Sequence, residues 1–125
     1  MLVKTEVDHE KQLTVKTVTG NPSFEESMTA FRQFYEGNLT KKVLWDFRKA
    51  SLYRISSNHI EIILDYIRQH AEKRAGGKTA ILISKDLEYG MSRMIQTLTE
   101  LKGIPIETAI FRSIEEAVHW LDKED

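Results

Sequence analysis

The chain has 125 residues, of which 41% are hydrophobic and 30% charged, and its formal net charge is −1. This length fits one domain, and the balanced charge excludes both a disordered chain and a surface basic enough to coat nucleic acid. The chain contains no cysteine, which excludes disulfides and thiolate chemistry. No apolar run has the length of a signal peptide or a membrane span. We therefore expect a single cytoplasmic domain over residues 1–125, with no membrane span and no nucleic-acid partner.

The first part of the chain predicts two strands, a helix and a third strand. Residues 2–7 and 13–19 alternate in polarity with a period of two, and the short polar break between them favours an antiparallel hairpin. Ser23 and Glu26 have the spacing of a capping box, which starts a helix. Residues 41–48 then begin apolar and end charged, as expected for a strand that reaches the edge of a sheet.

The second part of the chain predicts helices that alternate with strands. Ser56 or Ser57 can cap a second helix, and residues 79–84 are apolar enough for a strand buried on both faces. A third helix follows from Asp86, and residues 104–111 form the fifth strand. A second capping-box pattern then starts a fourth helix. The resulting order, ββαβαβαβα, predicts an α/β domain with a mixed, mainly parallel sheet.

Several spaced motifs stand out along the chain: a glycine, Gly20, before the first capped helix, then LWDFR at residues 44–48, YGMSRM at 89–94 and FRSIEEAVHWL at 111–121. Together they resemble the SpoIIAA-like family of the STAS domain superfamily. The resemblance covers nearly the whole chain and implies a β-sheet with helices wound along it. Stand-alone members of this type largely lack an assigned activity. Related domains serve as anti-anti-sigma factors switched by serine phosphorylation, as parts of anion transporters or, by distant likeness, as lipid carriers.

Serine phosphorylation is one function that this resemblance implies. Phosphorylated relatives carry an Asp-Ser-Ser-Gly-like segment at the start of the helix after the third strand. The matching stretch here is Ile55-Ser56-Ser57-Asn58, which keeps both serines but lacks the acidic residue and the glycine. Ser56 and Ser57 are therefore candidates for a phosphorylation switch. The alternative is that one of them only caps the helix.

A candidate anion site lies where the strands end. Because the carboxyl ends of parallel strands meet at one edge of a sheet, residues after different strands can converge there, beside helix N-termini that favour anions. Arginine binds phosphate or carboxylate in a bidentate manner. The alternative is a structural ion-pair network in which Asp46 and Asp86 neutralise the arginines. The candidate anion-binding residues are Arg48, Arg93, Arg112, Ser113 and Lys85, with Asp46, Asp86 and Gly90 in support.

Two of these features have further alternatives. Gly90 can allow close approach of the backbone either to a ligand or to a neighbouring strand. Met91, Met94 and Trp45 are candidates for a pocket that takes an acyl chain or another apolar ligand, because methionine adapts to irregular shapes. The alternative for these three side chains is ordinary core packing.

Sequence signatures of enzymes are missing. The chain has no Gly-x-Gly-x-x-Gly, no Gly-x-Ser-x-Gly, and no pair of histidines at metal-ligand spacing. We therefore expect no catalytic residue, no cofactor and no metal. The leading hypothesis is a non-catalytic binding or regulatory module that contacts a protein partner or a second copy, in a dimer, and holds a small anion. The alternatives are a carrier of an apolar ligand and a regulator switched at Ser56 or Ser57.

Overall fold

The computed structural model describes residues 2–84 and 86–123, and for residues 86–88 only the backbone. Its helices and strands alternate largely as the sequence predicts. In chain order they are β1 (Leu2–Asp8), β2 (Leu13–Gly20), α1 (Phe24–Glu36), β3 (Lys42–Ala50), α2 (Ser57–His70), the 3₁₀ helix η1 (Ala71–Arg74), β4 (Lys78–Leu82), α3 (Asp86–Leu101), β5 (Glu107–Phe111) and α4 (Ile114–Asp122).

The five strands form one sheet in which the spatial order β1-β2-β3-β4-β5 is also the chain order. β1 pairs antiparallel with β2, and every later pair is parallel. The predicted hairpin and the mixed, mainly parallel sheet of a single α/β domain are thus confirmed. None of the described helices combines the length and the apolar character that crossing a membrane requires.

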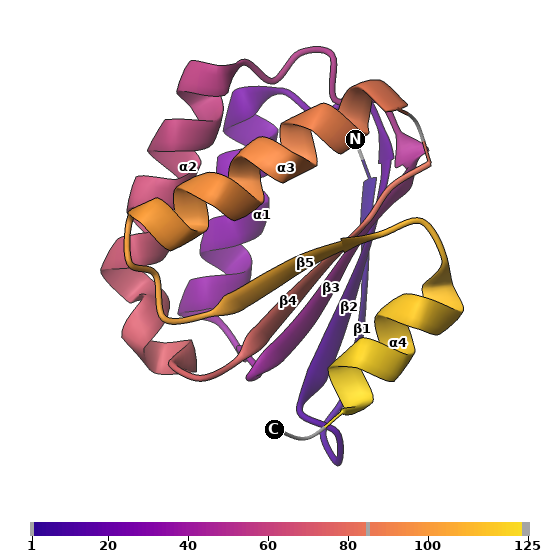
Figure 1. The fold of residues 1–125 in the computed structure, drawn as a ribbon, viewed down its shortest axis with the longest axis vertical. Coiled ribbons are helices and arrows are strands. Elements are labelled where there is room, and N and C mark those ends of the chain that lie inside the picture. Colours follow the sequence, from indigo (N-terminus) through magenta and orange to yellow (C-terminus); the bar gives the residue numbers. More distant parts are fainter. Residues whose placement is uncertain (1, 85, 124–125) are drawn as a thin grey trace.

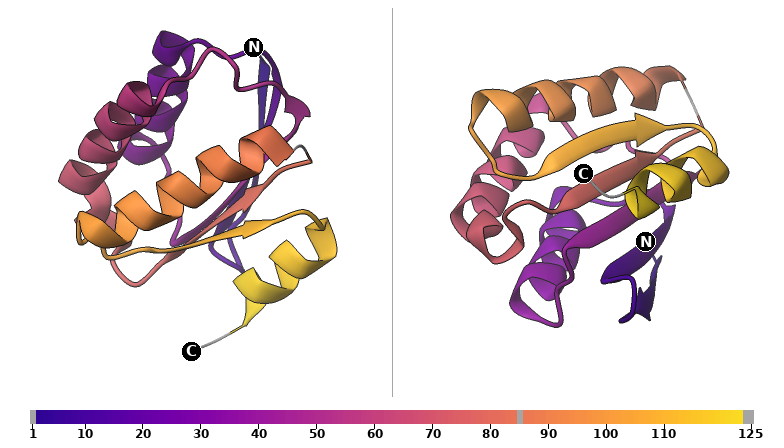
Figure 2. Two further views of the ribbon diagram at one scale, coloured as in Figure 1. Left: turned by 45° about the horizontal axis from the view of Figure 1, so that its top comes forward. Right: turned by 60° about the horizontal axis from the view of Figure 1, so that its bottom comes forward.

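The helices divide unequally between the two faces of the sheet. α1, α2 and α3 cover one face, while α4 alone covers the other, where it contacts β4 and β5 (Figures 1 and 2). This division follows from the strand order, because crossovers of one hand between successive neighbouring strands place their helices on the same side. Only the helix after the last strand is free to take the opposite face.

Side chains of the central strand β3 alternate between these two layers. Val43 and Trp45 point towards α1 and α2, where they pack with Phe34. Leu44 points the other way and packs with Leu121 of α4. A third apolar cluster joins α2, α3 and the segment that leads into β5. Because β3 is covered on both faces, its middle residues are almost fully buried.

Several boundaries differ from the sequence prediction by a residue or two, and two of them differ by more. The second helix ends at His70 and continues as η1, and the fifth strand begins at Glu107 rather than at residue 104. Pro105 has no N–H to donate, and its carbonyl accepts from Gly76 N at 2.9 Å instead of joining the strand ladder. Ile104 and Ile106 on either side are buried against α2 and α3. Ile104 and Ile106 therefore belong to the core, but only Glu107–Phe111 form the strand.

Candidate functional site

Asp46 and Arg48 form a closely bonded pair at the end of β3. The Arg48 side chain donates from Nε to Oδ1 at 3.1 Å and from Nη2 to Oδ2 at 2.9 Å, and its backbone N–H donates to Oδ1 at 3.0 Å. Burial alone would raise the pKa of Asp46, but the hydrogen bonds from Arg48 outweigh it and hold that pKa below its ordinary value. The guanidinium fork of Arg48 is therefore already occupied by a carboxylate.

The ends of β3 and β4 and the start of α4 converge here, as the anion hypothesis requires. Ser84 Oγ donates to the carbonyl of Arg48 at 3.2 Å. Ser113 caps α4 by accepting from Glu116 N, and its own hydroxyl donates to Glu115 Oε2 at 2.9 Å. Glu115 in turn helps Asp46 to raise the pKa of Arg48. Two carboxylates therefore act on this arginine, which favours the structural network over an anion site.

The other candidates for the anion site are spread more widely. The Arg112 guanidinium lies 5.2 Å from the centre of the Tyr89 ring, and Arg93 is exposed on α3. No close contact between Gly90 and a neighbouring strand is found, because a Cβ added there would meet no described atom beyond its own turn of helix within 4 Å. Close approach of a ligand to Gly90 remains a prediction. Lys85 and the side chain of Asp86 lie outside the described residues. Anion binding by this group remains a prediction.

Ser56 is the N-cap of α2. Its Oγ accepts from His59 N at 3.1 Å, and the Ser56 N–H donates to His59 Nδ1 at 3.1 Å, which completes a reciprocal capping box. The His59 ring also stacks on Phe24, with ring centres 4.6 Å apart. Ser57 is the first residue of the helix and is exposed. The capping role of Ser56 is confirmed, whereas phosphorylation of either serine remains a prediction.

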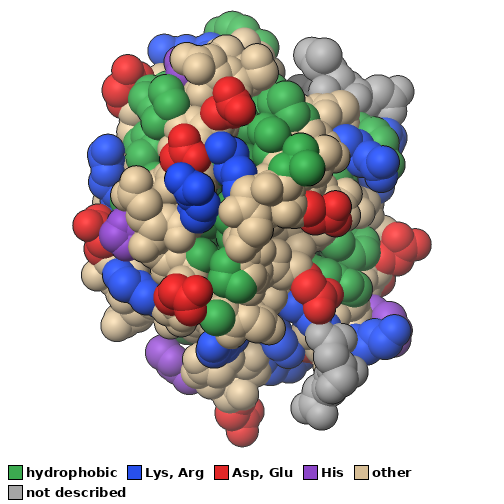
Figure 3. All heavy atoms as spheres, turned by 60° about the vertical axis from the view of Figure 1, so that its left-hand side comes forward, with side chains coloured by type: hydrophobic (Ala, Val, Ile, Leu, Met, Phe, Trp, Pro, Cys, Tyr) green, Lys and Arg blue, Asp and Glu red, His purple; other side chains and the backbone are tan. Residues whose placement is uncertain are grey.

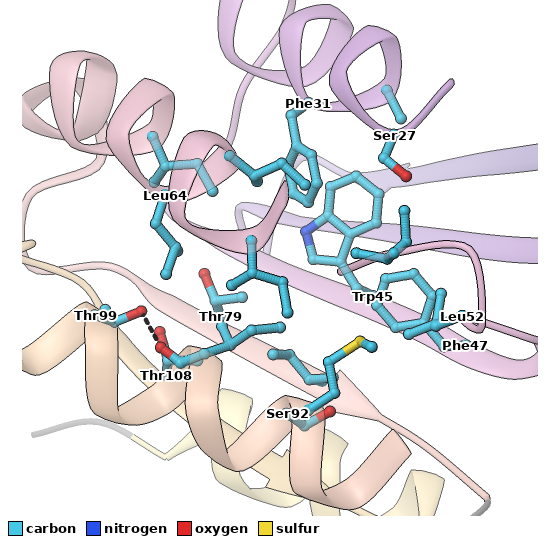
Figure 4. Close-up of a pocket in the computed structure, with 18 of the residues that line it drawn as sticks. Ser27, Phe31, Trp45, Phe47, Leu52, Leu64, Thr79, Ser92, Thr99 and Thr108 are labelled. Atoms are coloured by element: carbon cyan, nitrogen blue, oxygen red, sulfur yellow. Dashed lines mark hydrogen bonds between the residues drawn. The ribbon is translucent and has the colours of Figure 1, made fainter. Parts of the chain in front are cut away.

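An apolar cavity lies between the sheet and α1, α2 and α3 (Figure 4). Its volume is about 110 Å³. Its lining includes Ser27 and Phe31 of α1, Leu64 of α2 and Met91 of α3, while Trp45 forms part of the sheet side. Two of the three predicted pocket residues, Met91 and Trp45, thus line one cavity. Met94 packs with Met91 on the cluster between α2 and α3 but does not line the cavity.

Aromatic rings form one wall of this cavity. Phe31 and Trp45 lie with ring centres 4.7 Å apart, and Phe47 stacks on the other side of Trp45 at 6.2 Å with nearly parallel planes. Only 4% of Trp45 is exposed to solvent. The ring faces are rigid and apolar, so this wall suits another aromatic or aliphatic group.

Hydroxyl groups are the main polar groups on the opposite wall. Thr99 Oγ1 donates to the Ile95 carbonyl within its own helix at 2.7 Å, and Thr79 Oγ1 accepts from Arg74 at 3.2 Å. These hydroxyls are therefore satisfied without a ligand. No charged side chain belongs to the described residues that line the cavity. The space can accept an uncharged molecule but offers no counter-ion to a charged one.

Arg74 is a structural residue that the sequence analysis missed. It is fully buried and makes five hydrogen bonds, all to neutral oxygens, while its guanidinium lies 5.2 Å from the centre of the Phe34 ring. Burial lowers the pKa of Arg74, and Tyr35 opposes that effect. Its acceptors are the carbonyls of Thr40, Lys41 and Lys78 and the hydroxyls of Tyr35 and Thr79. An arginine in the last turn of a predicted helix is usually a surface residue, so the sequence carried no signal for this role.

The outer surface carries charges of both signs. On the face that includes α2, lysines and arginines alternate with acidic side chains, and apolar groups lie between them (Figure 3). Among the described residues, no three histidine, aspartate or glutamate side chains gather closely enough to hold a metal ion. A comparison with protein-family models finds no match, and one with curated proteins finds none either.

Proposed function

We propose that this domain is a non-catalytic binding module whose ligand is a small, uncharged, apolar molecule held between the sheet and α1, α2 and α3. The observation that carries the proposal is the cavity itself, which has aromatic and aliphatic walls and no charged lining residue among those described. Protein interiors are normally close-packed, with few voids larger than a water molecule. A cavity of about 110 Å³ therefore leaves room that a ligand can fill.

The size of the cavity limits the ligand. An engineered apolar cavity of about 150 Å³ stays dry and binds benzene. The cavity here, at about 110 Å³, is of the same order, so a single ring or a short aliphatic chain fits it best. A long acyl chain would require the helices to move away from the sheet.

The lining chemistry limits the ligand further. Burial of a charge without a partner costs far more than burial of apolar surface gains, so a carboxylate or phosphate has no place in this space. Ser56 and Arg48, by contrast, are already hydrogen-bonded within the protein, Ser56 to His59 and Arg48 to Asp46. These contacts support the apolar ligand over the anion that was the leading expectation.

Fluorescence and thermal unfolding together test this proposal. Trp45 lines the cavity, whereas Trp120 packs against Phe111 on the other face of the sheet, so a Trp120→Phe background isolates the useful signal. We expect benzene, toluene and hexanol to change Trp45 emission saturably and to raise the melting temperature. The stabilisation should approach about 2.7 kcal/mol at a ligand concentration one hundred times the dissociation constant.

A matched pair of variants on α1 locates the ligand. Ser27→Leu places a larger apolar side chain at the cavity wall, and Thr29→Leu makes a similar change on the exposed side of the same helix. Both hydroxyls donate to the carbonyl four residues earlier, so the lost hydrogen bond is the same. Ser27→Leu should abolish the shifts and Thr29→Leu should keep them. Equal shifts in both variants, or none with any of the three probes, would refute the proposal.

We also propose that the chain is a SpoIIAA-like domain of the STAS type that acts in the cytoplasm. Support for this comes from the spaced motifs at residues 44–48, 89–94 and 111–121 and from the ββαβαβαβα order. An apolar ligand agrees with the distant likeness of such domains to lipid carriers. Solvent extraction of protein purified from its own host tests the carrier role, because a carrier should release a hydrophobic molecule and an empty extract would argue against it.

A further inference from the structure

The two edges of the sheet are protected to different degrees. At β5, Gln96 Nε2 of α3 donates to the carbonyl of Thr108 at 2.9 Å, and both α3 and α4 flank the strand. At the other edge, β1 lies last in the sheet, and six of its seven residues are exposed (Figure 1). Within the described chain, β1 has a strand partner on one side only. An exposed edge of this length is a template for pairing with another strand.

The side chains of β1 follow a pattern that is complementary to itself. Lys4 and Glu6 lie on the same face of the strand, with Nζ and Oε1 3.1 Å apart. On the opposite face, Val3 packs against the cluster under α1, while Val7 remains 39% exposed. Thr5 lies at the centre of this five-residue pattern.

We propose that two copies of the chain pair their β1 strands antiparallel, about a two-fold axis at Thr5, to form one continuous ten-stranded sheet. In this register Thr5 lies opposite the partner's Thr5. Lys4 then lies opposite the partner's Glu6, and Val3 lies opposite the partner's Val7. Two lysines and two glutamates form an alternating group on one face, and on the other face the exposed Val7 of each copy becomes buried against the partner's Val3.

Charge selects this register over its neighbours. A shift of the two-fold axis to residue 4 or to residue 6 places Lys4 opposite its own copy or Glu6 opposite its own copy, and like charges directly opposite one another oppose pairing. Both shifts also shorten the paired length. A register centred between two successive residues would pair side chains from opposite faces of β1. One copy would then be turned over, and the helices of the two copies would lie on opposite faces of the sheet. The register at Thr5 alone pairs all seven residues of β1 and opposes unlike charges.

Charge reversal tests the proposed pairing. Light scattering and sedimentation of the full chain should show a dimer whose dissociation constant rises about tenfold or more in Lys4→Glu and in Glu6→Lys, since each variant opposes like charges twice. The double variant Lys4→Glu/Glu6→Lys should dimerise like the natural chain. An equimolar mixture of the two single variants should form a heterodimer. Glu61→Lys on the exposed side of α2 is the matched charge control and should leave the dimer unchanged.

A single cysteine tests the position of the axis. The chain has no cysteine of its own, and Thr5 is exposed. Residues directly opposite in antiparallel strands have Cα atoms about 4.5–5.5 Å apart, which a disulfide can span. Under mild oxidation Thr5→Cys should therefore form a covalent dimer, whereas His9→Cys in the hairpin turn should not.

Several outcomes would overturn the proposal. A monomer at every concentration would do so, as would a dimer that both single charge reversals leave intact. A dimer that the double variant fails to restore would place the contact elsewhere. A natural chain that stays monomeric alone but takes up an added peptide strand would assign this edge to a different partner. Circular dichroism of each variant confirms that the fold survives, so that loss of the dimer is not loss of structure.

Discussion

Arg74 shows how far one residue can determine local structure. Its guanidinium joins η1 to the starts of β3 and β4 and to the hydroxyl of Tyr35 on α1. All of its acceptors are neutral oxygens, so the charge is held by dipoles and by the faces of Phe34 and Tyr35. No other side chain has five donors in one plane, and for this reason lysine cannot replace it.

Replacement of Arg74 should therefore destabilise the folded protein. We expect Arg74→Lys to lower the free energy of unfolding by about 3 kcal/mol, because several buried carbonyls lose their donors. Urea denaturation at neutral pH measures this change. Lys73→Met, at the exposed neighbouring position, should alter stability by about 0.5 kcal/mol or less. A similar small loss in both variants would show that the buried network contributes little.

The Asp46–Arg48 pair predicts a dependence of stability on pH. Because the pKa of Asp46 is lowered in the folded protein, its contribution is complete above the unfolded value of about 3.9 and disappears as the pH falls through the folded value. Asp46→Asn should cost about 1 kcal/mol at pH 7, a modest amount because Arg48 is partly exposed. The difference from the natural chain should shrink below about pH 4. A constant difference from pH 7 to pH 3 would contradict this assignment.

The sequence predicts the Asp46–Arg48 pair far better than it predicts the hydrogen bonds of Arg74. Asp46 and Arg48 are two positions apart on one strand, so they share a face and their pairing is local. The partners of Arg74 come from α1 and from the loops before β3 and β4, which only the folded chain brings together. Position relative to a helix end, the only local signal, indicated a surface role.

At the scale of elements, local signals predicted most starts and stops. The capping box of Ser23 and Glu26 begins α1, and Gly103, with a positive φ of 66°, follows α3. Such signals depend on residues within one helical turn of each other, so the sequence alone is enough to predict these helix ends. The change from α2 to η1 and the late start of β5 occur instead beside Arg74 and Pro105, whose side-chain or backbone bonds join residues far apart in the sequence.

The cap of α2 gives a prediction at this scale. Ser56→Ala removes the acceptor for His59 N and should destabilise the protein by about 1 kcal/mol. Ser57→Ala removes an exposed hydroxyl one residue later and should change stability by about 0.5 kcal/mol or less. Thermal unfolding of both variants distinguishes the two serines. If Ser57→Ala were the more damaging, the capping assignment would be wrong.

The anion hypothesis also belongs to the scale of elements, because it depends on strand ends and the start of α4. Since Asp46 and Glu115 already accompany Arg48, we expect phosphate and sulfate to raise the melting temperature equally in the natural chain and in Arg112→Ala. Differential scanning fluorimetry in matched ionic strength measures this. A gain that Arg112→Ala abolishes would restore the anion site as the better hypothesis.

At the scale of the whole molecule, the cavity could not be predicted from the pattern of apolar residues. Met91 and Met94 share one helical periodicity and both pack on the cluster between α2 and α3, yet only Met91 also lines the cavity. The cavity lies between three helices and the sheet, and no single segment encodes it. The sequence predicted the layers and most of the core but not the space between them.

The cavity should make the protein sensitive to pressure. Unfolding under pressure is favoured by the internal void volume that unfolding removes. Ser27→Leu places apolar atoms at the cavity wall, so its volume change of unfolding should be smaller in magnitude than that of the natural chain. Fluorescence-detected pressure denaturation measures both, with Thr29→Leu as the control. Identical volume changes in all three proteins would show that the side chain does not enter the cavity.

The agreement between chain order and sheet order has a consequence for synthesis on the ribosome. Each strand that emerges finds its neighbour already made, so the sheet can grow from β1 towards β5 without waiting for distant sequence. The face of the sheet under α4 is covered later than the other face. Leu13, Leu44 and Leu82 have no helical cover until the segment Ile114–Asp122 has been released. The nascent domain therefore exposes an apolar face of the sheet until α4 has emerged, and any chain cut short before α4 keeps that face.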